Sequence, residues 1–207
     1  MCRLPARVRG SAGIGHNLPM TSLSQNPDLD PKEVAARLLI TPTALEELTL
    51  DDAILVVNYM QPRRIADGTV LMREGEDVHN DFMLLVLEGE VSVASEVNGV
   101  DEDIVVSVLG AGALIGEMGL LDGTPRSATC TADGDVVTAI LTRPNMLALM
   151  REEPRVAARL LLAMTKRLAD RLRETNRKVK ALAQINRTLR QELNLVMNNR
   201  TPPLPRQ

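Results

Sequence analysis

Aromatic side chains are the scarcest class in this chain of 207 residues, which has no tryptophan, one tyrosine (Tyr59) and one phenylalanine (Phe82). Proteins that bind single-stranded nucleic acid stack successive bases on aromatic rings, so the composition disfavours that function. Hydrophobic residues make up 44% of the chain. Together with the length, they are sufficient for one core and one additional element, and we expect one domain.

Metal-ligating and catalytic side chains are also few. Cys2 and Cys130 do not have the spacing of metal ligands, and two histidines, His16 and His79, cannot form a metal cluster by themselves. Serine, histidine and aspartate are not arranged in any catalytic motif, and two histidines leave little scope for general base chemistry. We therefore expect two reduced thiols, no metal site and no enzymatic activity.

Long apolar runs are absent. No segment approaches the roughly 20 residues of a membrane span, and the arginine-bearing start lacks the continuous apolar stretch of a secretory signal. These absences predict a cytoplasmic protein with no membrane contact. Residues 1–19 are basic and acid-free, which is also compatible with a transit peptide, and Met20 is an alternative start.

Composition divides the chain into four parts. Residues 1–31 are rich in glycine, proline, serine and asparagine without apolar periodicity, which predicts a disordered tail. Residues 32–150 have the pattern of the folded domain, 151–198 that of a long dimerisation helix, and 199–207 that of a second tail.

Two short helices are predicted before a strand-rich region. Asp30 and Thr41 can accept hydrogen bonds from free backbone N–H groups, and the proline that follows each suits a first helical turn. From residue 68 to residue 142, short runs such as DFMLLVL and EVSVAS are separated by glycine or aspartate turns, which predicts an antiparallel sheet, closed or nearly closed. Gly75 and Gly89 are expected at tight turns or bulges.

Helical periodicity follows Pro144. Apolar residues recur at alternating steps of four and three, which is the heptad repeat of a coiled coil. Asn186 falls at an a position, where a buried amide pairs with its copy in a parallel two-stranded coil. We predict a parallel homodimer through residues 161–196; the alternative is one amphipathic helix lying on its own domain. The predicted heptad seam is Leu161, Thr165, Leu168, Leu172, Thr175, Val179, Leu182, Asn186, Leu189, Leu193 and Val196.

Charge is unevenly distributed along the chain. Residues 1–150 hold 10 basic and 22 acidic side chains, whereas residues 151–190 hold 12 and 4. A basic helix can meet nucleic acid or an acidic partner, but such a face on a coiled coil is more often solvated. We therefore do not expect nucleic-acid binding.

The stretch GEMGLLDGTPRSAT, residues 116–129, combines groups that suit a phosphate and its sugar. Gly116 can turn the chain sharply, so that the first N–H groups of a short helix face an anion. Arg126 offers a planar two-donor fork, with the hydroxyls of Ser127 and Thr129 nearby. An ionised Glu117 only accepts hydrogen bonds, and it therefore suits a sugar 2′-hydroxyl.

This stretch resembles the phosphate-binding cassette of the cyclic nucleotide-binding domain family. The resemblance runs from about Leu45 to Leu172 and includes DGTVLMREGE, LEGEVSV and LGAGALIGEMGLLDGTPRSAT. It implies an α+β fold, an eight-stranded antiparallel, jelly-roll-like β-roll flanked by N-terminal helices and a long C-terminal coiled-coil helix. It also implies a cyclic purine nucleotide as the ligand, with no further cofactor. The matching positions are Gly116, Glu117, Leu120, Leu121, Gly123, Arg126, Ser127 and Ala128.

The resemblance also implies roles for single residues. Glu117 would bind the ribose 2′-hydroxyl, Arg126 the cyclic phosphate, and Ser127 the phosphate or the purine. The alternative is a structural Glu117–Arg126 ion pair in an empty pocket, although such a pair recovers little of its desolvation cost. The predicted ligand-binding residues of the cassette are Gly116, Glu117, Met118, Arg126, Ser127, Ala128 and Thr129.

The purine end departs from the family pattern. In the catabolite-activator class of transcription factors, hydroxyl residues on the long helix contact the adenine; the matching positions are Arg171 and Leu172, and both are kept as ligand-binding candidates. Asp170 could accept from guanine, and Arg171 could stack on or donate to either purine. An exposed Asp170–Arg171 charge pair is the alternative. Cyclic AMP is the first choice on family frequency, and cyclic GMP the next.

The sequence after the heptad repeat bears on how the protein would pass on a signal. Transcription-regulating members carry a helix-turn-helix domain there, whereas this sequence continues only with NNRTPPLPRQ, so we expect no DNA-reading domain. Our first hypothesis is a sensor dimer that signals through an unknown partner protein. The alternatives are a structural or adaptor dimer with a vestigial pocket, and a transcription-associated regulator without its own DNA-reading domain.

Overall fold

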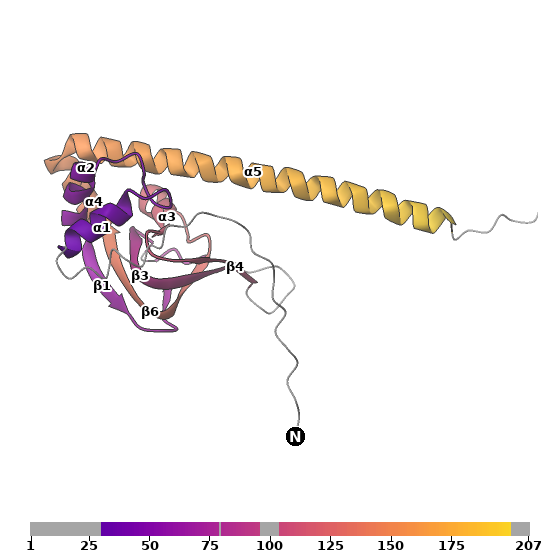
Figure 1. Cartoon of the computed structure of the whole chain (residues 1–207), viewed down its shortest axis with the longest axis horizontal. Helices are drawn as coiled ribbons and strands as arrows, with labels where there is room; N and C mark the ends of the chain where they lie inside the picture. Colours follow the sequence, from indigo (N-terminus) through magenta and orange to yellow (C-terminus); the bar gives the residue numbers. More distant parts are fainter. Residues whose placement is uncertain (1–29, 79, 96–103, 200–207) are drawn as a thin grey trace, which may run out of the picture.

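The computed structural model describes residues 30–78, 80–95 and 104–199 (Figure 1). Most of the two predicted tails, residues 1–29 and 200–207, lies outside the described residues. The helices are α1 (Pro31–Leu39), α2 (Leu50–Asn58), α3 (Glu117–Asp122), α4 (Arg143–Glu152) and α5 (Pro154–Asn199). The strands are β1 (Gln61–Ile65), β2 (Val70–Met72), β3 (Phe82–Ser95), β4 (Ile104–Leu109), β5 (Leu114–Ile115) and β6 (Thr129–Thr142).

The first helix starts where the sequence predicts, and the second does not. Asp30 caps α1 by accepting from the Lys32 N–H. Thr41 instead closes the end of α1, because its hydroxyl donates to the Leu38 carbonyl. The start of α2 at Leu50 is fixed by a capping box between Thr49 and Asp52, in which each satisfies a backbone N–H of the other.

The strands form one antiparallel sheet of six, in the order β1-β6-β3-β4, with β2 also paired to β6 and β5 to β3. The eight strands implied by the family resemblance are therefore not all separate in the described residues. Two predicted runs merge into β3, a continuous strand of 14 residues. The strand β1 was not predicted, because this edge strand exposes Arg63 and Arg64 instead of an apolar face.

Gly89 forms the bulge that the sequence predicts. Its φ is +84°, and the register of β3 against β6 shifts between Val86 and Glu88 and again between Glu88 and Glu90. A Cβ atom at this position would lie 2.5 Å from the Asp135 carbonyl oxygen, so only glycine allows the two strands to pass so closely. The bulge allows the single strand β3 to pair with β5 in its first part and with β4 in its second part.

The core has two parts that meet at the sheet. One part packs α1, α2, α4 and the first turns of α5 against the sheet and includes Leu85, Leu141, Leu149 and Leu160. The other lies among the strands themselves and includes Val86, Val91, Ile115 and Val136. The first turns of α5 are thereby fixed to the β domain.

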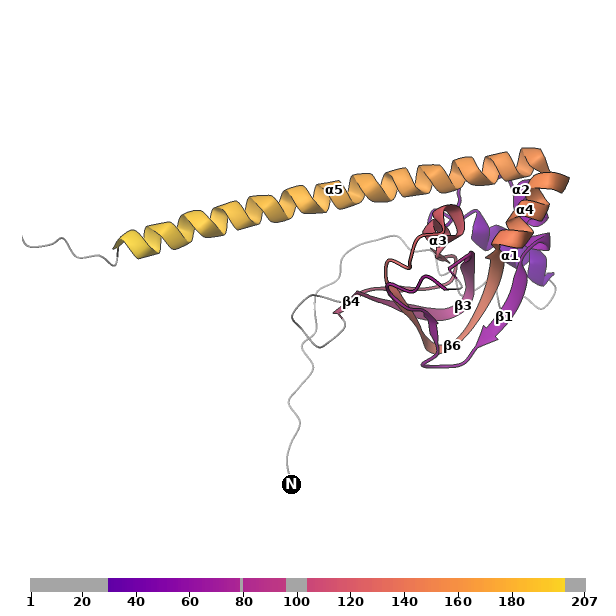
Figure 2. The same cartoon turned by 180° about the vertical axis from the view of Figure 1, so that it is seen from behind.

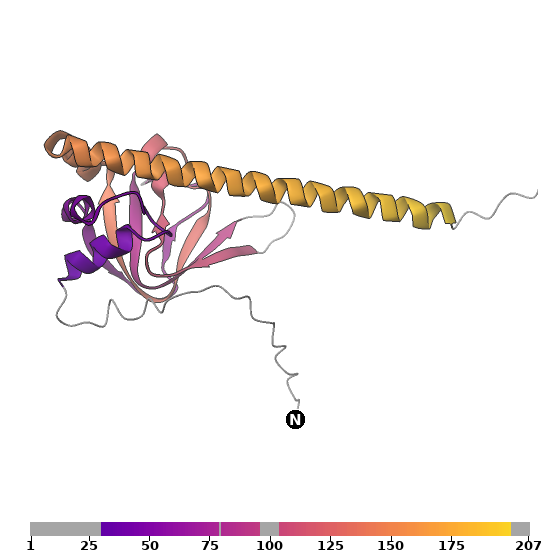
Figure 3. The same cartoon turned by 45° about the horizontal axis from the view of Figure 1, so that its top comes forward.

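The long helix predicted after Pro144 is present as α5, which contains 46 residues. It crosses the β domain beside α3 and then extends beyond the sheet (Figures 2 and 3). Every residue from 171 to 195 is exposed, so this half of α5 buries no side chain against its own domain. None of the helices in the described ranges combines the length and the apolar character needed to cross a bilayer.

Candidate functional site

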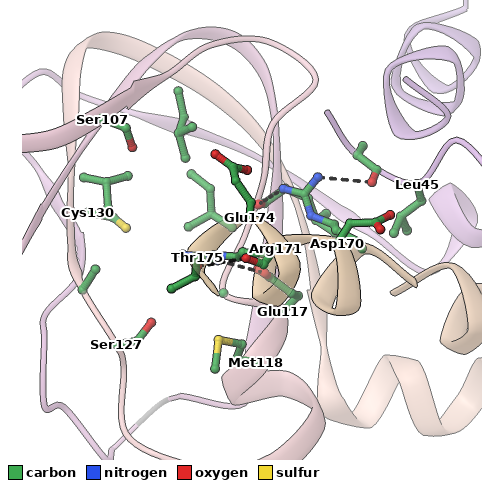
Figure 4. Close-up of a pocket in the computed structure, with 18 of the residues that line it drawn as sticks. Leu45, Ser107, Glu117, Met118, Ser127, Cys130, Asp170, Arg171, Glu174 and Thr175 are labelled. Carbon is green, nitrogen blue, oxygen red and sulfur yellow. Dashed lines mark hydrogen bonds and ion pairs between the residues drawn. The ribbon is translucent and has the colours of Figure 1, made fainter. Parts of the chain in front are cut away.

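A cavity of about 860 Å³ lies between the sheet, the segment around α3 and the helix α5 (Figure 4). Its volume falls within the roughly 300–1,000 Å³ typical of small-molecule sites. Seven of the nine predicted site residues line it, namely Gly116, Glu117, Met118, Arg126, Ser127, Ala128 and Arg171. The cassette and the long helix therefore line one cavity.

Gly116 begins the cassette in a conformation that requires glycine. It is the N-cap of α3, and its φ is +83°. A Cβ atom there would lie 2.5 Å from Met72 Cε and 2.7 Å from Arg126 Nη1, far closer than packed atoms approach. The chain can therefore pass directly beneath the Arg126 guanidinium.

The turn after α3 positions Arg126 next to Gly116. Asp122 accepts from both the N–H and the hydroxyl of Thr124, and these hydrogen bonds hold the pKa of Asp122 below its ordinary value. Asn80, which is buried, donates its side-chain N–H groups to the carbonyls of Gly123 and Thr124. The Arg126 backbone pairs with the predicted turn at Gly75: its N–H donates to the Glu76 carbonyl, and its carbonyl accepts from the Gly75 N–H.

The Arg126 guanidinium is buried in the wall of the cavity, with 6% of the residue exposed. Nη1 donates to the Gly116 carbonyl and Nη2 to the Phe82 carbonyl, each at 3.1 Å. The group also lies 4.5 Å from the centroid of the Phe82 ring, within cation–π range. Burial lowers the pKa of Arg126, while neighbouring carboxylates, including that of Glu117, raise it. An arginine side chain remains charged in a protein, so the cavity contains a fixed, buried cation.

Glu117 is the first residue of α3 and is also buried. Its Oε1 accepts from Arg171 Nη1, on α5, at 3.3 Å (Figure 4). The acceptors of Arg126 described above are backbone carbonyls, so the structure does not match the simple Glu117–Arg126 ion pair considered from the sequence. Glu117 is paired across the cavity to α5.

Asp170 is paired differently from the sequence-based alternative. It forms an ion pair with Arg173 Nη1 at 2.7 Å, along α5, whereas Arg171 pairs with Glu117. Asp170 nevertheless lines the cavity, together with Glu174 and Thr175 of the next turn.

Arg167 is a cavity residue that sequence reasoning missed. Its Nη1 donates to the carbonyls of Thr43 and Ala44, and its Nη2 donates to the Leu114 carbonyl. Burial lowers its pKa. These contacts fasten α5 to the strand that leads into the cassette. No signal in the sequence separates this arginine from the solvated basic residues of the same helix.

Two predicted site residues lie outside the cavity lining. The Thr129 hydroxyl accepts from the Glu74 N–H and thus closes the turn that supports Arg126. Leu172 is 62% exposed, because it lies one residue beyond Arg171 on a helix and faces away from the cavity. Neither Thr129 nor Leu172 lines the cavity of its own chain.

The sheet side of the cavity carries side chains that the sequence did not predict as site residues. Ser107 of β4 and Cys130 of β6 lie on the same side as Ser127 (Figure 4). Burial raises the pKa of the Cys130 thiol to about 11, so it is protonated at neutral pH. These three side chains are therefore uncharged at neutral pH, in contrast to Glu117 and Arg171.

Comparisons with known proteins agree with this geometry. The family model described as the cyclic nucleotide-binding domain matches residues 62–153. A cyclic nucleotide-gated potassium channel of Rhizobium etli is 36% identical over 102 residues, which are 49% of this chain and 26% of the channel. The cyclic AMP receptor protein of Thermus thermophilus is 32% identical over 123 residues, 59% of this chain and 56% of that protein. The chain thus spans about a quarter of the channel and just over half of the receptor protein.

A solved structure agrees in fold as well. The crystal structure of a cyclic nucleotide-binding domain from Methylobacillus flagellatus KT has a TM-score of 0.59 and 28% identity, and the match covers 69% of this chain and 79% of that one. Both the N-terminal helices and the six-stranded sheet with its long helix fit this domain. With its glycine-cradled arginine and its buried glutamate on one cavity, this chain contains a cyclic nucleotide-binding domain, which the family model matches over residues 62–153.

Proposed function

We propose that this protein is a sensor of a cyclic purine nucleotide, with Arg126 binding the cyclic phosphate and Glu117 binding the ribose 2′-hydroxyl. The observation that carries the proposal is the burial of both side chains, 6% and 2% exposed, on one cavity. Burying charged groups costs free energy that an ion pair often recovers only in part. A ligand with one anionic group and one hydroxyl donor fits this pair.

The other cassette residues complete the ligand site in this proposal. Ser127 offers a hydroxyl to the phosphate or the purine, and the backbone around Gly116 and Ala128 surrounds the phosphate. Met118 is 39% exposed at the cavity, where it offers an apolar surface. Cyclic AMP is the first ligand to test, because the Thermus thermophilus relative is named as a receptor for it, and cyclic GMP is the second.

A parallel homodimer is the second part of the proposal. Residues 171–195 of α5 are all exposed, and an isolated helix with an open apolar row gains little stability from propensity alone. Between residues 171 and 195, the large apolar residues of the heptad seam are 58–65% exposed. Burying each contributes about 1.5–3 kcal/mol. These seam residues are Leu172, Val179, Leu182, Leu189 and Leu193.

A second copy is the occupant that this row fits best. The seven-residue spacing persists across the row, and Asn186 stands at an a position, which favours a copy in parallel register. Leu161 and Leu168, by contrast, are half-buried within their own chain. The part of the seam that is open to a partner therefore begins at Leu172.

Ligand binding would be transmitted through α5, which forms one wall of the cavity and continues into the exposed half. A ligand shifts the helix between two arrangements only by its difference in affinity for them, commonly about 1–3 kcal/mol. The exposed half of α5 would pass this change to a partner protein.

Calorimetry on nucleotide-free protein tests the phosphate assignment. We expect Arg126→Ala to weaken cyclic AMP binding by roughly 2–5 kcal/mol, because it leaves a buried charged partner unpaired. Arg143→Ala removes the same charge from an exposed residue outside the cavity lining and should leave the affinity unchanged. Equal affinities in the two variants would reject Arg126 as the phosphate ligand.

A further inference from the structure

Arg171 is the contact between α5 and the cassette. Toward the start of the helix, Arg159 pairs with Asp52 of α2, and Arg167 donates to the carbonyl of Leu114 in β5. Arg171 then reaches Glu117, and from this residue to residue 195 the helix is exposed throughout. The Glu117–Arg171 pair therefore lies where α5 leaves the domain.

The pair engages only part of the Glu117 carboxylate. Arg171 Nη1 donates to Oε1 at 3.3 Å. At the Asp52–Arg159 pair, in contrast, the arginine Nη1 reaches both carboxylate oxygens, at 3.0 and 2.9 Å. A carboxylate accepts about four hydrogen bonds, so Glu117 can receive a hydroxyl while Arg171 stays bound.

The two members of the pair differ greatly in burial. The Glu117 side chain is 3% exposed and that of Arg171 is 60% exposed. Glu117 also interacts electrostatically with the buried Arg126 and Arg167, so without Arg171 its carboxylate could rotate toward those cations. Arg171 thus holds the Glu117 carboxylate in the orientation that a hydroxyl donor requires.

On the basis of the proposed function, we propose that Arg171 is a positioning residue for the sugar: it holds Glu117 for the ribose 2′-hydroxyl and does not read the purine. This assignment replaces the direct purine contact considered from the sequence. In this assignment the Glu117 carboxylate accepts hydrogen bonds both from Arg171 of α5 and from the 2′-hydroxyl. The 2′-hydroxyl is then the part of the ligand that is coupled to α5. Base selectivity then resides elsewhere in the cavity.

This inference is tested by a thermodynamic cycle of four binding affinities, in which the hydroxyl is removed from the ligand and the guanidinium from the protein. Affinities for cyclic AMP and 2′-deoxy cyclic AMP are measured by calorimetry on the full chain and on Arg171→Gln. In the unmodified protein, loss of the hydroxyl should weaken binding roughly tenfold or more, as expected for a hydrogen bond to a charged group. In Arg171→Gln this ratio should fall to about twofold or less, and Arg171→Lys should restore part of it.

Arg173→Gln is the matched control. It removes the same charge two residues away, where Arg173 pairs with Asp170 along α5, and it should keep the full ratio. Both arginines are largely exposed, and a thermal melt checks that each variant is folded. The ratio of cyclic AMP to cyclic GMP affinity should be the same in Arg171→Gln as in the unmodified protein.

Several outcomes would overturn the inference and leave the proposed function intact. An unchanged ribose-to-deoxyribose ratio in Arg171→Gln would mean that Arg171 does not act through the hydroxyl. Tighter binding of cyclic AMP by that variant would mean that Arg171 competes with the sugar. An altered ratio of cyclic AMP to cyclic GMP would mean that it reads the purine. If the unmodified protein binds none of these nucleotides, the proposed function itself fails, and the inference fails with it.

Discussion

Replacement of Gly116 by alanine tests whether this glycine positions Arg126. The substitution should strain the backbone and also displace the Arg126 guanidinium. The φ of Gly116 is +83°, and a residue with a side chain costs roughly 1–2 kcal/mol in that region. The added Cβ would also lie 2.7 Å from Arg126 Nη1 and 3.0 Å from the Phe82 carbonyl oxygen. The guanidinium must therefore move away from the Gly116 and Phe82 carbonyls that orient it.

The loss in affinity follows from that displacement. One hydrogen bond to a charged group contributes about 1.5–3 kcal/mol, so Gly116→Ala should weaken cyclic AMP binding by roughly 10- to 150-fold in calorimetry. Its thermal midpoint should also fall by several degrees, since 1 kcal/mol shifts a domain of this size by about 2–4 °C.

Gly123→Ala is the matched control for this variant. Gly123 ends the same helix with a φ of +70°, and its Cβ would meet only the end of the exposed Arg143 side chain, at 3.2 Å. It should lose similar stability, yet bind cyclic AMP as the unmodified protein does. Equal affinities in the two alanine variants would refute the argument that the glycine cradle positions Arg126.

Two further predictions concern the coiled coil and the cavity wall. Asn186→Leu should leave the dimer stable and loosen its register or oligomer number, which light scattering and crosslinking detect; a monomeric unmodified protein would contradict the seam. The Cys130 thiol has a pKa of about 11 in the folded chain and an ordinary value of 9.0, so the unfolded chain loses this proton first as the pH rises. The free energy of unfolding should therefore fall between pH 9 and pH 11, by about 2–3 kcal/mol from this group. Urea unfolding of Cys130→Ala should lack that contribution, and equal pH slopes in the two proteins would reject it.

The cassette was predictable because its residues lie close together in the sequence. Gly116 and Arg126 are brought together by a single short helix and one turn, and both are found on the cavity. Gly89 and the start of α1 were predictable for the same reason, since a bulge glycine and an N-cap act on their neighbours. Local chemistry thus sufficed to predict that these two residues share one cavity.

Contacts between distant segments were not predictable from the same patterns. The partner of Glu117 is Arg171, 54 residues away, and the acceptors of Arg167 are distant carbonyls of the N-terminal turn and of β5. The seven-residue repeat shows which face of α5 is apolar, but not which of its arginines touches the domain. Leu172, which counting along the helix made a site candidate, does not line the cavity of its own chain.

The start of the second helix could not be decided from the sequence, because two positions qualify as its N-cap. Thr41–Pro42 and Thr49 both have the residue types of a helix start. The capping box with Asp52 satisfies two backbone groups at Thr49, whereas Thr41 is used by the end of α1. Asp52 is further held by Arg159 of α5, a contact that no local pattern contains.

The central claim, that the cavity binds a cyclic purine nucleotide, is tested most directly by titrating nucleotide-stripped protein with cyclic AMP and cyclic GMP in separate calorimetric experiments, with linear 5′-AMP as the control. We predict one site per chain for at least one cyclic nucleotide, with a dissociation constant in the micromolar range or tighter, and weaker binding of the linear nucleotide. The absence of heat with both cyclic nucleotides would contradict the sensor function and favour an adaptor dimer with an empty cavity.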